Sequence, residues 1–168
     1  MSAKGRVLVA MSGGVDSSVT AVLLAEQGYE VVGITMKTWD YSTSGGGNNG
    51  KEVGCCTLES INDARAIALR HGFTHFIVDI REEFGDWVIE RFTNEYLAGR
   101  TPNPCVLCNT HIKWAALLRR ADDLDCEYIA TGHYARVQHN EELDRYLLKR
   151  GLDRKKDQSY ALWGPRTN

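Results

Sequence analysis

The chain has 168 residues, of which 43% are hydrophobic and 25% charged, and its formal net charge is −2. This composition is that of an ordinary soluble globular protein, which argues against a disordered or membrane-embedded chain. Because the overall charge is not positive, a nucleic acid would have to bind to a local group of basic residues. The length suits a single domain with its own hydrophobic core.

The N-terminus and the cysteines indicate the cellular compartment. Residues 1–5 lead directly into an apolar run, without a signal-peptide core or an arginine-rich transit pattern. Five cysteines, with Cys105 and Cys108 in a CxxC pair, suit a reducing compartment better than a disulfide framework. We therefore expect a cytoplasmic protein that does not interact with a membrane.

The first half of the chain alternates between strand-like and helix-like patterns. The expected elements, in chain order, are a strand over 6–10, a helix over 17–27, a strand over 29–36, a helix over 58–71 and a strand over 75–80. Gly28 and Gly72 fit the position just after a helix end. Residues 38–56 are glycine-rich and polar, which predicts a mobile loop.

The second half continues the alternation less clearly. A helix is expected over 82–97 with its apolar side facing the core, a rigid proline loop over 99–104, a helix from an Asn109 N-cap to Arg120, and a strand over 127–131. After Val137 the chain turns polar, and no clear final element is expected. Strands alternating with helices predict an α/β fold, a doubly wound parallel sheet with helices on both faces.

Residues 12–18 read SGGVDSS and connect the first strand to the first helix. Glycines allow the backbone to approach a phosphate, and the N-terminal amides of a helix point toward it. Neither GxxxxGK nor GxGxxG is present, which excludes the two common nucleotide motifs. The run resembles the signature of PP-loop ATP pyrophosphatases, which cleave ATP between the α and β phosphates and adenylate a substrate. The resemblance implies ATP, with Mg²⁺ offsetting the charge of Asp16.

Several enzymes with different substrates share that signature, among them GMP, NAD and argininosuccinate synthetases, so other residues must indicate the substrate. Residues 99–109 read GRTPNPCVLCN, and Ile112-Lys113-Trp114 follow. This segment resembles GRTPNPDxxCNxxIKF of the tRNA-specific 2-thiouridylases, which replace the 2-oxygen of the wobble uridine with sulfur. ATGHYAR at 130–136 and KDQSY at 156–160 match two further blocks of that family. With the ATP loop, these blocks cover nearly the whole chain.

The resemblance implies a role for particular residues. It places ATP contacts at Ala10, Met11, Ser12, Gly13, Gly14, Val15, Asp16, Ser17, Met36 and Gly132. It places tRNA contacts at Asn103, Pro104, Cys105, His133, Lys156, Asp157 and Gln158, the first three at the target base. Cys108 matches the thiol nucleophile of the family. A cysteine on a rigid loop just before a helix is physically suited to thiolate chemistry, because the helix N-terminus lowers the thiol pKa.

Cys105 departs from the family pattern, because many members carry Asp at this position. Either the Cys105 thiol does comparable acid or base work, or the CxxC pair joins a third cysteine in an iron–sulfur cluster. We favour thiol chemistry and assign no metal site. Zinc would need Cys55, Cys56 or Cys126 as further ligands. Cys126 is most simply a small core residue, and the sequence indicates no role for Cys55 and Cys56.

These residues predict a tRNA-uridine 2-sulfurtransferase that converts ATP to AMP and pyrophosphate. ATP would adenylate the uridine 2-oxygen, and sulfur from a cysteine persulfide, supplied by a donor protein, would displace AMP. Proteins of the family are longer, with a second catalytic cysteine and further tRNA-binding domains. We therefore expect residues 1–168 to be the truncated ATP-binding and thiolation domain.

Two alternatives remain open from the sequence. The chain could be another PP-loop ligase acting on a small molecule or nucleotide, or a non-catalytic module that binds RNA or a metal through its CxxC pair. The histidines outside the motifs are expected to be solvated or packed rather than catalytic; they are His71, His75, His111 and His139.

Overall fold

A computed structural model of the chain describes residues 4–38, 57–85, 89–102 and 112–162. The chain forms two compact units, one made of Met1–Gly85 with Ala116–Gly132, the other of Asp86–Ala115 with His133–Asn168. No helix in the described part is long and apolar enough to cross a membrane.

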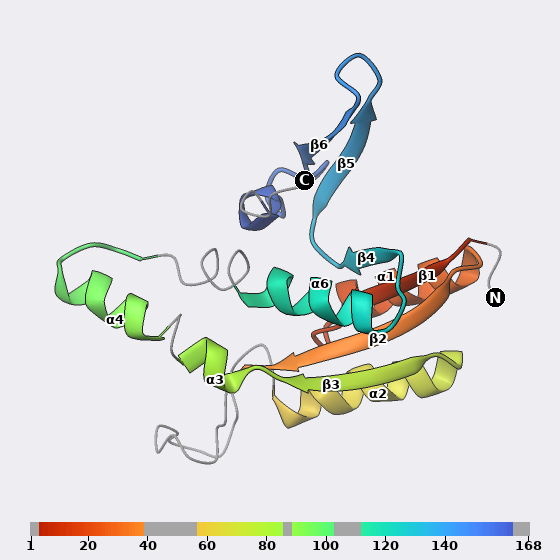
Figure 1. The fold of residues 1–168 in the computed structure, drawn as a ribbon, viewed down its shortest axis with the longest axis horizontal. Helices are drawn as coiled ribbons and strands as arrows, with labels where there is room; N and C mark the ends of the chain where they lie inside the picture. The colour runs from red at the N-terminus through yellow and green to blue at the C-terminus, as the bar shows by residue number, and fades with distance from the viewer. Residues whose placement is uncertain (1–3, 39–56, 86–88, 103–111, 163–168) are drawn as a thin grey trace. The chain divides into compact units, whose positions relative to one another are not determined.

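The first unit is built on a four-stranded sheet. Its strands are β1 (Arg6–Ala10), β2 (Glu30–Lys37), β3 (Thr74–Asp79) and β4 (Tyr128–Thr131), in the order β3-β2-β1-β4 and all parallel. Helices α1 (Val15–Glu26) and α2 (Leu58–His71) lie behind the sheet in Figure 1, and α6 (Trp114–Asp123) crosses in front of it. This arrangement confirms the predicted α/β fold with helices on both faces.

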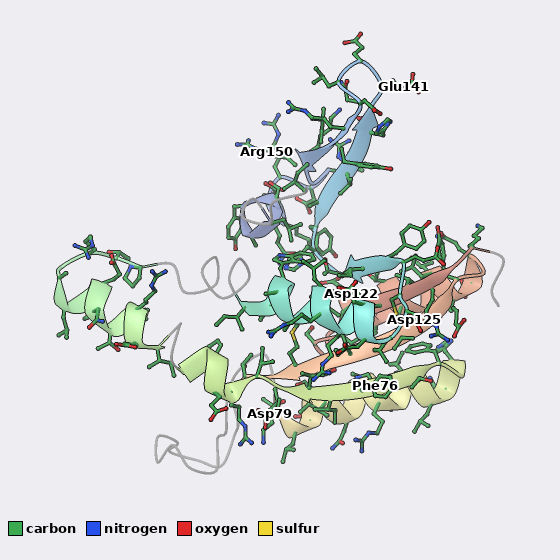
Figure 2. The ribbon with its side chains drawn as sticks, in the orientation of Figure 1. Phe76, Asp79, Asp122, Asp125, Glu141 and Arg150 are labelled. Atoms are coloured by element: carbon green, nitrogen blue, oxygen red, sulfur yellow. The ribbon has the colours of Figure 1, made fainter. Side chains whose placement is uncertain are left out.

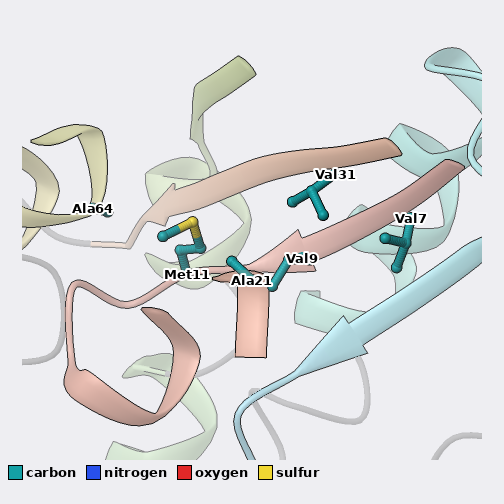
Figure 3. Packing of buried hydrophobic residues seen from close by; sticks show 6 residues of the cluster. All are labelled: Val7, Val9, Met11, Ala21, Val31 and Ala64. Carbon is teal, nitrogen blue, oxygen red and sulfur yellow. The ribbon is translucent and has the colours of Figure 1, made fainter. Parts of the chain in front are cut away.

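The central strand β1 is buried on both faces, which explains its continuous apolar sequence. Leu8 is 0% exposed on one face, and Val7 and Val9 are 2% and 0% exposed on the other. Figure 3 shows the core cluster on the second face, formed by Val7, Val9, Met11, Ala21, Val31 and Ala64. The two alanines belong to α1 and α2, and their small size lets both helices approach the sheet. The cluster extends to Met11, just beyond the carboxyl end of β1.

The ends of α1 and α2 follow from local sequence. The Oγ1 of Thr57 caps α2 by accepting a hydrogen bond from the amide of Ser60 at 3.1 Å. Gly72 ends α2 with φ +73°, and Gly28 follows the end of α1 with φ +92°, so both predicted glycine stops are confirmed. Helix α6 runs three residues beyond its predicted end at Arg120. Its expected cap, Asn109, lies outside the described residues, as does the loop predicted over 38–56 except for Thr38, which is buried.

The expected core-facing helix over 82–97 corresponds to two short helices, α3 (Arg81–Phe84) and α4 (Glu90–Leu97). Residues 86–88, between them, lie outside the described part. The core-facing prediction is wrong for α4, which has no buried residue; Tyr96 is 69% exposed and Leu97 79%. A one-sided apolar pattern identifies an amphipathic helix, but it does not identify what covers the apolar side.

The second unit contains a β-hairpin that the sequence analysis missed. Strands β5 (Ala135–Asn140) and β6 (Arg145–Arg150) pair antiparallel, and the short helix η3 (Ser159–Leu162) follows. The side chain of Asn140 accepts a hydrogen bond from the amide of Leu143 in the turn, and Asp144 has φ +45°. Because most residues of both strands are exposed and polar, the hydrophobic pattern that marks a strand is weak here.

Candidate nucleotide-binding site

The loop between β1 and α1 is closed by the side chain of Ser17, which is 5% exposed. Its hydroxyl donates to the carbonyl of Gly14 at 3.1 Å and accepts from the amide of Ser12 at 3.2 Å. The hydroxyls of Ser17 and Ser12 are 3.4 Å apart. The hydroxyl of Ser18 also donates to the Gly14 carbonyl, at 3.0 Å. Hydrogen bonds within the loop therefore hold its shape.

The two glycines of this loop differ in what their positions require. Gly13 has φ +77°, and a Cβ at this position would lie 2.1 Å from the carbonyl oxygen of Ser60 in α2. Gly14 is the N-cap residue of α1 and carries no side chain that could cap the first turn. A helix start that lacks a side-chain cap can be completed by an anionic ligand. The loop therefore fits a phosphate group.

The end of β4 forms the other side of this site. A Cβ on Gly132 would lie 2.7 Å from the amide nitrogen of Ser17, so only glycine fits without a shift of backbone. Thr131 of β4 pairs with Ala10 of β1. The chain passes from β1 to β2 and β3 on one side, whereas β4 lies on the other, so the strand order reverses between β1 and β4. Open α/β sheets bind ligands at the carboxyl ends of strands at such a switch point.

The structure brings most of the expected ATP-contacting residues to this edge of the sheet. They are Ala10, Met11, Ser12, Gly13, Gly14, Val15, Asp16, Ser17 and Gly132. Met11 is buried, whereas the side chains of Val15 and Asp16 are exposed in the first turn of α1. Met36 lies one residue before the end of the neighbouring strand β2 and is half-buried.

Two side chains that were not expected to act at this site lie behind the loop. The hydroxyl of Thr35 donates to the carbonyl of Met11 at 2.8 Å, and its oxygen is 2.8 Å from Nε2 of His75. Burial, with a smaller contribution from Arg65, lowers the pKa of His75 below its usual range. A polar residue in the otherwise apolar run of β2 is the only sequence signal that pointed to this contact.

The cysteines assigned to catalysis, Cys105 and Cys108, lie outside the described residues, as do Asn103 and Pro104. Cys126 is half-buried, and its Sγ lies 3.7 Å from the carbonyl oxygen of Leu124. Burial raises the pKa of the Cys126 thiol, which disfavours a reactive thiolate. Among the described residues, no group of three or more His, Cys, Asp or Glu side chains could hold a metal ion.

The second unit joins the two sequence blocks that were assigned to tRNA. The side-chain oxygen of Gln158 accepts a hydrogen bond from the backbone amide of Tyr134 at 3.0 Å. The backbone amide of Gln158 donates to the backbone carbonyl of Tyr134, also at 3.0 Å. Nζ of Lys156 lies 5.2 Å from the centroid of the Tyr134 ring. Burial and the nearby Lys113 lower the pKa of His133. His133 and Lys156 to Gln158 therefore belong to one local structure at the base of the hairpin.

Asp157 organises this structure through backbone contacts. One of its carboxylate oxygens accepts from the amide of Gly151 at 2.8 Å and from that of Ser159 at 3.2 Å, and the other accepts from the Ser159 hydroxyl at 3.0 Å. These hydrogen bonds lower the pKa of Asp157, and the bond from the Gly151 amide makes the largest contribution. Asp157 thus connects the end of β6 to the start of η3.

Charges are unevenly distributed along the hairpin. In Figure 2, Glu141 lies at the turn and Arg150 at the far end of β6. Glu142 and Asp144 are also in the turn, beside Arg145 at the start of β6. The basic residues toward the base and in the following segment are Arg136, Lys149, Arg150, Arg154, Lys155 and Lys156, and they outnumber the acidic residues there, Asp153 and Asp157. The second unit therefore carries the local basic group that a nucleic acid would require in a chain of net negative charge.

A parallel sheet with a glycine loop at its switch point defines an α/β nucleotide-binding protein. The chain belongs to the family whose model is described as the tRNA methyl transferase HUP domain, which it matches over residues 5–167.

Its curated relatives include tRNA-specific 2-thiouridylases of three bacteria. The chain is 82% identical to the protein of Salinibacter ruber, over 98% of this chain and 43% of that protein. It is 73% identical to the protein of Amoebophilus asiaticus, over 96% of this chain and 42% of that protein. It is 53% identical to the protein of Desulforamulus reducens, over 98% of this chain and 44% of that protein. These relatives confirm the resemblance drawn from the sequence blocks. The chain spans less than half the length of each.

A solved structure supports the fold independently. The glutamine-dependent NAD⁺ synthetase of Acinetobacter baumannii superposes with a TM-score of 0.51 at 21% identity, over 77% of this chain and 22% of that protein. At this identity the likeness shows the fold alone.

Proposed function

We propose that the chain carries the ATP-dependent activation step of tRNA 2-thiolation. The observation that carries this proposal is the loop over 12–18, which offers the start of α1 to a phosphate at the β1/β4 switch point. The identity with 2-thiouridylases, which reaches 82%, supports tRNA as the substrate.

In this proposal the phosphates of ATP lie against the N-terminal turn of α1. Gly13 and Gly14 keep side chains away from the phosphates, and Gly132 closes the opposite side of the loop. Asp16, in the first turn of α1, would repel a polyphosphate. Mg²⁺ bound with ATP offsets this repulsion because it neutralises part of the phosphate charge.

The reaction has two group-transfer steps. The uridine 2-oxygen attacks the α-phosphate of ATP, the bond to the β-phosphate breaks, and pyrophosphate leaves. The terminal sulfur of a persulfide on one of two catalytic cysteines then attacks carbon 2 and AMP leaves. Cys108 is one of the two, and the family resemblance places the other in a later segment. The cysteine that does not carry the persulfide cleaves the sulfur–sulfur bond and forms a disulfide with its partner. A donor protein supplies the persulfide sulfur, and Cys105 serves as a proton-transferring thiol in place of the usual Asp.

The proposed tRNA contacts divide into two groups. Asn103, Pro104 and Cys105 meet the target base, as the family resemblance implies. His133 and Lys156 to Gln158 meet the rest of the tRNA, together with the basic residues at the base of the hairpin. Cations close to phosphates supply most of the affinity of such contacts. A tRNA substrate and a catalytic CxxC pair both fit the expected cytoplasmic location.

ATP–pyrophosphate exchange in the full-length protein, measured with and without tRNA, tests this function. We expect exchange only with unmodified tRNA, and mass spectrometry should detect 2-thiouridine once a persulfide donor is added. Exchange driven by a small molecule without tRNA would identify another PP-loop ligase. Absence of ATP binding, with stoichiometric zinc or iron in anaerobically purified protein, would identify a binding module instead.

A further inference from the structure

We infer that His75 is a positioning residue for the nucleotide loop and acts through the hydroxyl of Thr35 on the carbonyl of Met11. The inference rests on the proposed ATP site. Met11 immediately precedes the loop, whereas His75 lies on β3, separated from β1 by β2.

The contact is a chain of two short hydrogen bonds. The Thr35 oxygen is 2.8 Å from the Met11 carbonyl oxygen and 2.8 Å from Nε2 of His75. The Met11 amide donates to the carbonyl of Ile34 at 2.8 Å. Both backbone polar groups of Met11 are therefore held by β2, directly before the first residue of the loop.

The direction of each bond follows from the number of protons. A carbonyl oxygen only accepts, so the single hydroxyl proton of Thr35 is used in the bond to Met11. The Thr35 oxygen must then accept from His75, which requires a proton on Nε2. Neutral His75 therefore has its lone pair on Nδ1. This fixed tautomer orients the Thr35 hydroxyl toward Met11.

Stability alone does not account for a histidine at this position. Nδ1 of His75 is buried and has no hydrogen-bond partner among the described residues. An unsatisfied buried polar atom costs free energy, whereas an apolar side chain of similar size would not carry this cost. The other nitrogen, Nε2, is the atom that contacts Thr35. We therefore infer that position 75 carries a histidine because its Nε2–H donates a hydrogen bond to the Thr35 oxygen.

The surrounding sheet leaves space for this contact. A Cβ on Gly33 would lie 2.8 Å from Sδ of Met11 and 3.1 Å from Cδ2 of His75. The side chains of Met11 and His75 thus converge over Gly33, a glycine within the buried run of β2. Thr35 is 1% exposed and Met11 is 3% exposed, so water does not replace the bonds easily.

Loss of the His75 donor should affect the binding of ATP more than the chemical step. Without it, the Thr35 hydroxyl can rotate to another rotamer, which releases the Met11 carbonyl and loosens the start of the loop. A loop that must be ordered on binding weakens the affinity for its ligand. The expected signature is a raised KM for ATP with little change in kcat.

The test compares paired substitutions in the full-length protein, assayed by tRNA-dependent ATP–pyrophosphate exchange. His75→Leu removes the donor and should raise the KM for ATP about 5-fold, the effect of one hydrogen bond. His75→Gln keeps an N–H donor near Nε2 and should restore most of the affinity. Thr35→Val should resemble His75→Leu, and Thr35→Ser should resemble the wild type. Phe73→Leu, a packing change beside Gly33, should lower the melting temperature without changing KM.

Nitrogen-15 chemical shifts of His75 provide a second measurement that needs no ATP. We expect a neutral ring protonated on Nε2 in the wild type and a loss of this preference in Thr35→Val. An unchanged KM in a folded His75→Leu variant, equal impairment by Leu and Gln, or protonation on Nδ1 would each overturn the inference. If the proposed function fails instead, the wild type shows no exchange while the Nε2 tautomer is still observed.

Discussion

Gly132 and Ser17 approach so closely that a Cβ at position 132 would lie 2.7 Å from the amide nitrogen of Ser17. Ser17 is also the residue whose hydroxyl closes the loop between β1 and α1, through Gly14 and Ser12. The end of β4 and the first turn of α1 therefore form one packed structure at the switch point of the sheet. Substitutions at the end of β4 or in the first turn of α1 should therefore both alter the affinity of the nucleotide site for ATP.

Gly132→Ala should weaken ATP binding. The new methyl group would meet the backbone of Asp16 and Ser17, which must shift because both contacts fall below 3.0 Å. Overpacking of this kind costs about 1–3 kcal/mol, so we expect ATP affinity to fall roughly 10-fold. Isothermal titration calorimetry measures the change. Gly85→Ala is the matched control, since a Cβ there meets no atom within 4 Å; equal affinities in the two variants would contradict the prediction.

Gly13→Ala should destabilise the fold as well as the site. Gly13 and Gly72 have nearly equal positive φ, +77° and +73°, but only at Gly13 would a Cβ meet other atoms, 2.1 Å from the Ser60 carbonyl oxygen. Gly72→Ala therefore measures the cost of the left-handed backbone alone, about 1 kcal/mol. Urea unfolding should show a clearly larger loss for Gly13→Ala. Similar losses for both would mean that α2 moves away without cost.

Much of the first unit could be predicted because its signals are local. A glycine just after an apolar helical pattern is enough to predict where α1 and α2 end. A short continuous run of apolar residues is enough to predict a buried strand. The contact between Thr35 and His75 could not be predicted, because it joins residues on two strands through register. Nor does the position of Gly13 in sequence reveal that α2 blocks its Cβ.

The second unit shows the opposite case. The hairpin of β5 and β6 has few buried positions, so period-2 alternation is lost among charged residues. Its recognition blocks are identified by family resemblance, but the sequence does not show that they are joined by hydrogen bonds between Gln158 and Tyr134. The roles of Cys105 and Cys108 remain predictions from the sequence.

Folding stability should fall as the pH is lowered below neutrality. Both His75 and His133 have a pKa below the ordinary value of 6.5, chiefly because of burial. Just below that value the unfolded chain binds more protons than the folded one, so stability is full above it and decreases toward the folded pKa. Urea unfolding at about pH 8 and about pH 5.5 should show this loss. His133→Gln should reduce the pH dependence; an unchanged slope would contradict the assignment.

Cys108→Ser should abolish 2-thiouridine formation by the full-length protein, whereas Cys126→Ala should not. A serine can neither carry the persulfide sulfur nor form the disulfide that releases it, and burial raises the pKa of the Cys126 thiol, which disfavours its thiolate. Liquid chromatography with mass spectrometry of digested tRNA measures the product. ATP–pyrophosphate exchange should survive in Cys108→Ser, because adenylation precedes sulfur transfer. Normal thiolation in that variant would show that the nucleophile lies elsewhere.

Lys156→Ala should weaken tRNA binding by removing one phosphate contact. Nζ of Lys156 lies 5.2 Å from the ring centroid of Tyr134, which holds the charge at the base of the hairpin. Lys4 is a matched control, because its Nζ lies 5.8 Å from the ring centroid of Tyr29, just before β1 and at the opposite strand end from the loop. If Lys156 contacts a phosphate, its loss should reduce the slope of log affinity against log salt by about 1, uniformly among tRNA sequences. Lys4→Ala should leave that slope unchanged, and an equal effect from both lysines would indicate nonspecific attraction rather than a contact at the hairpin base.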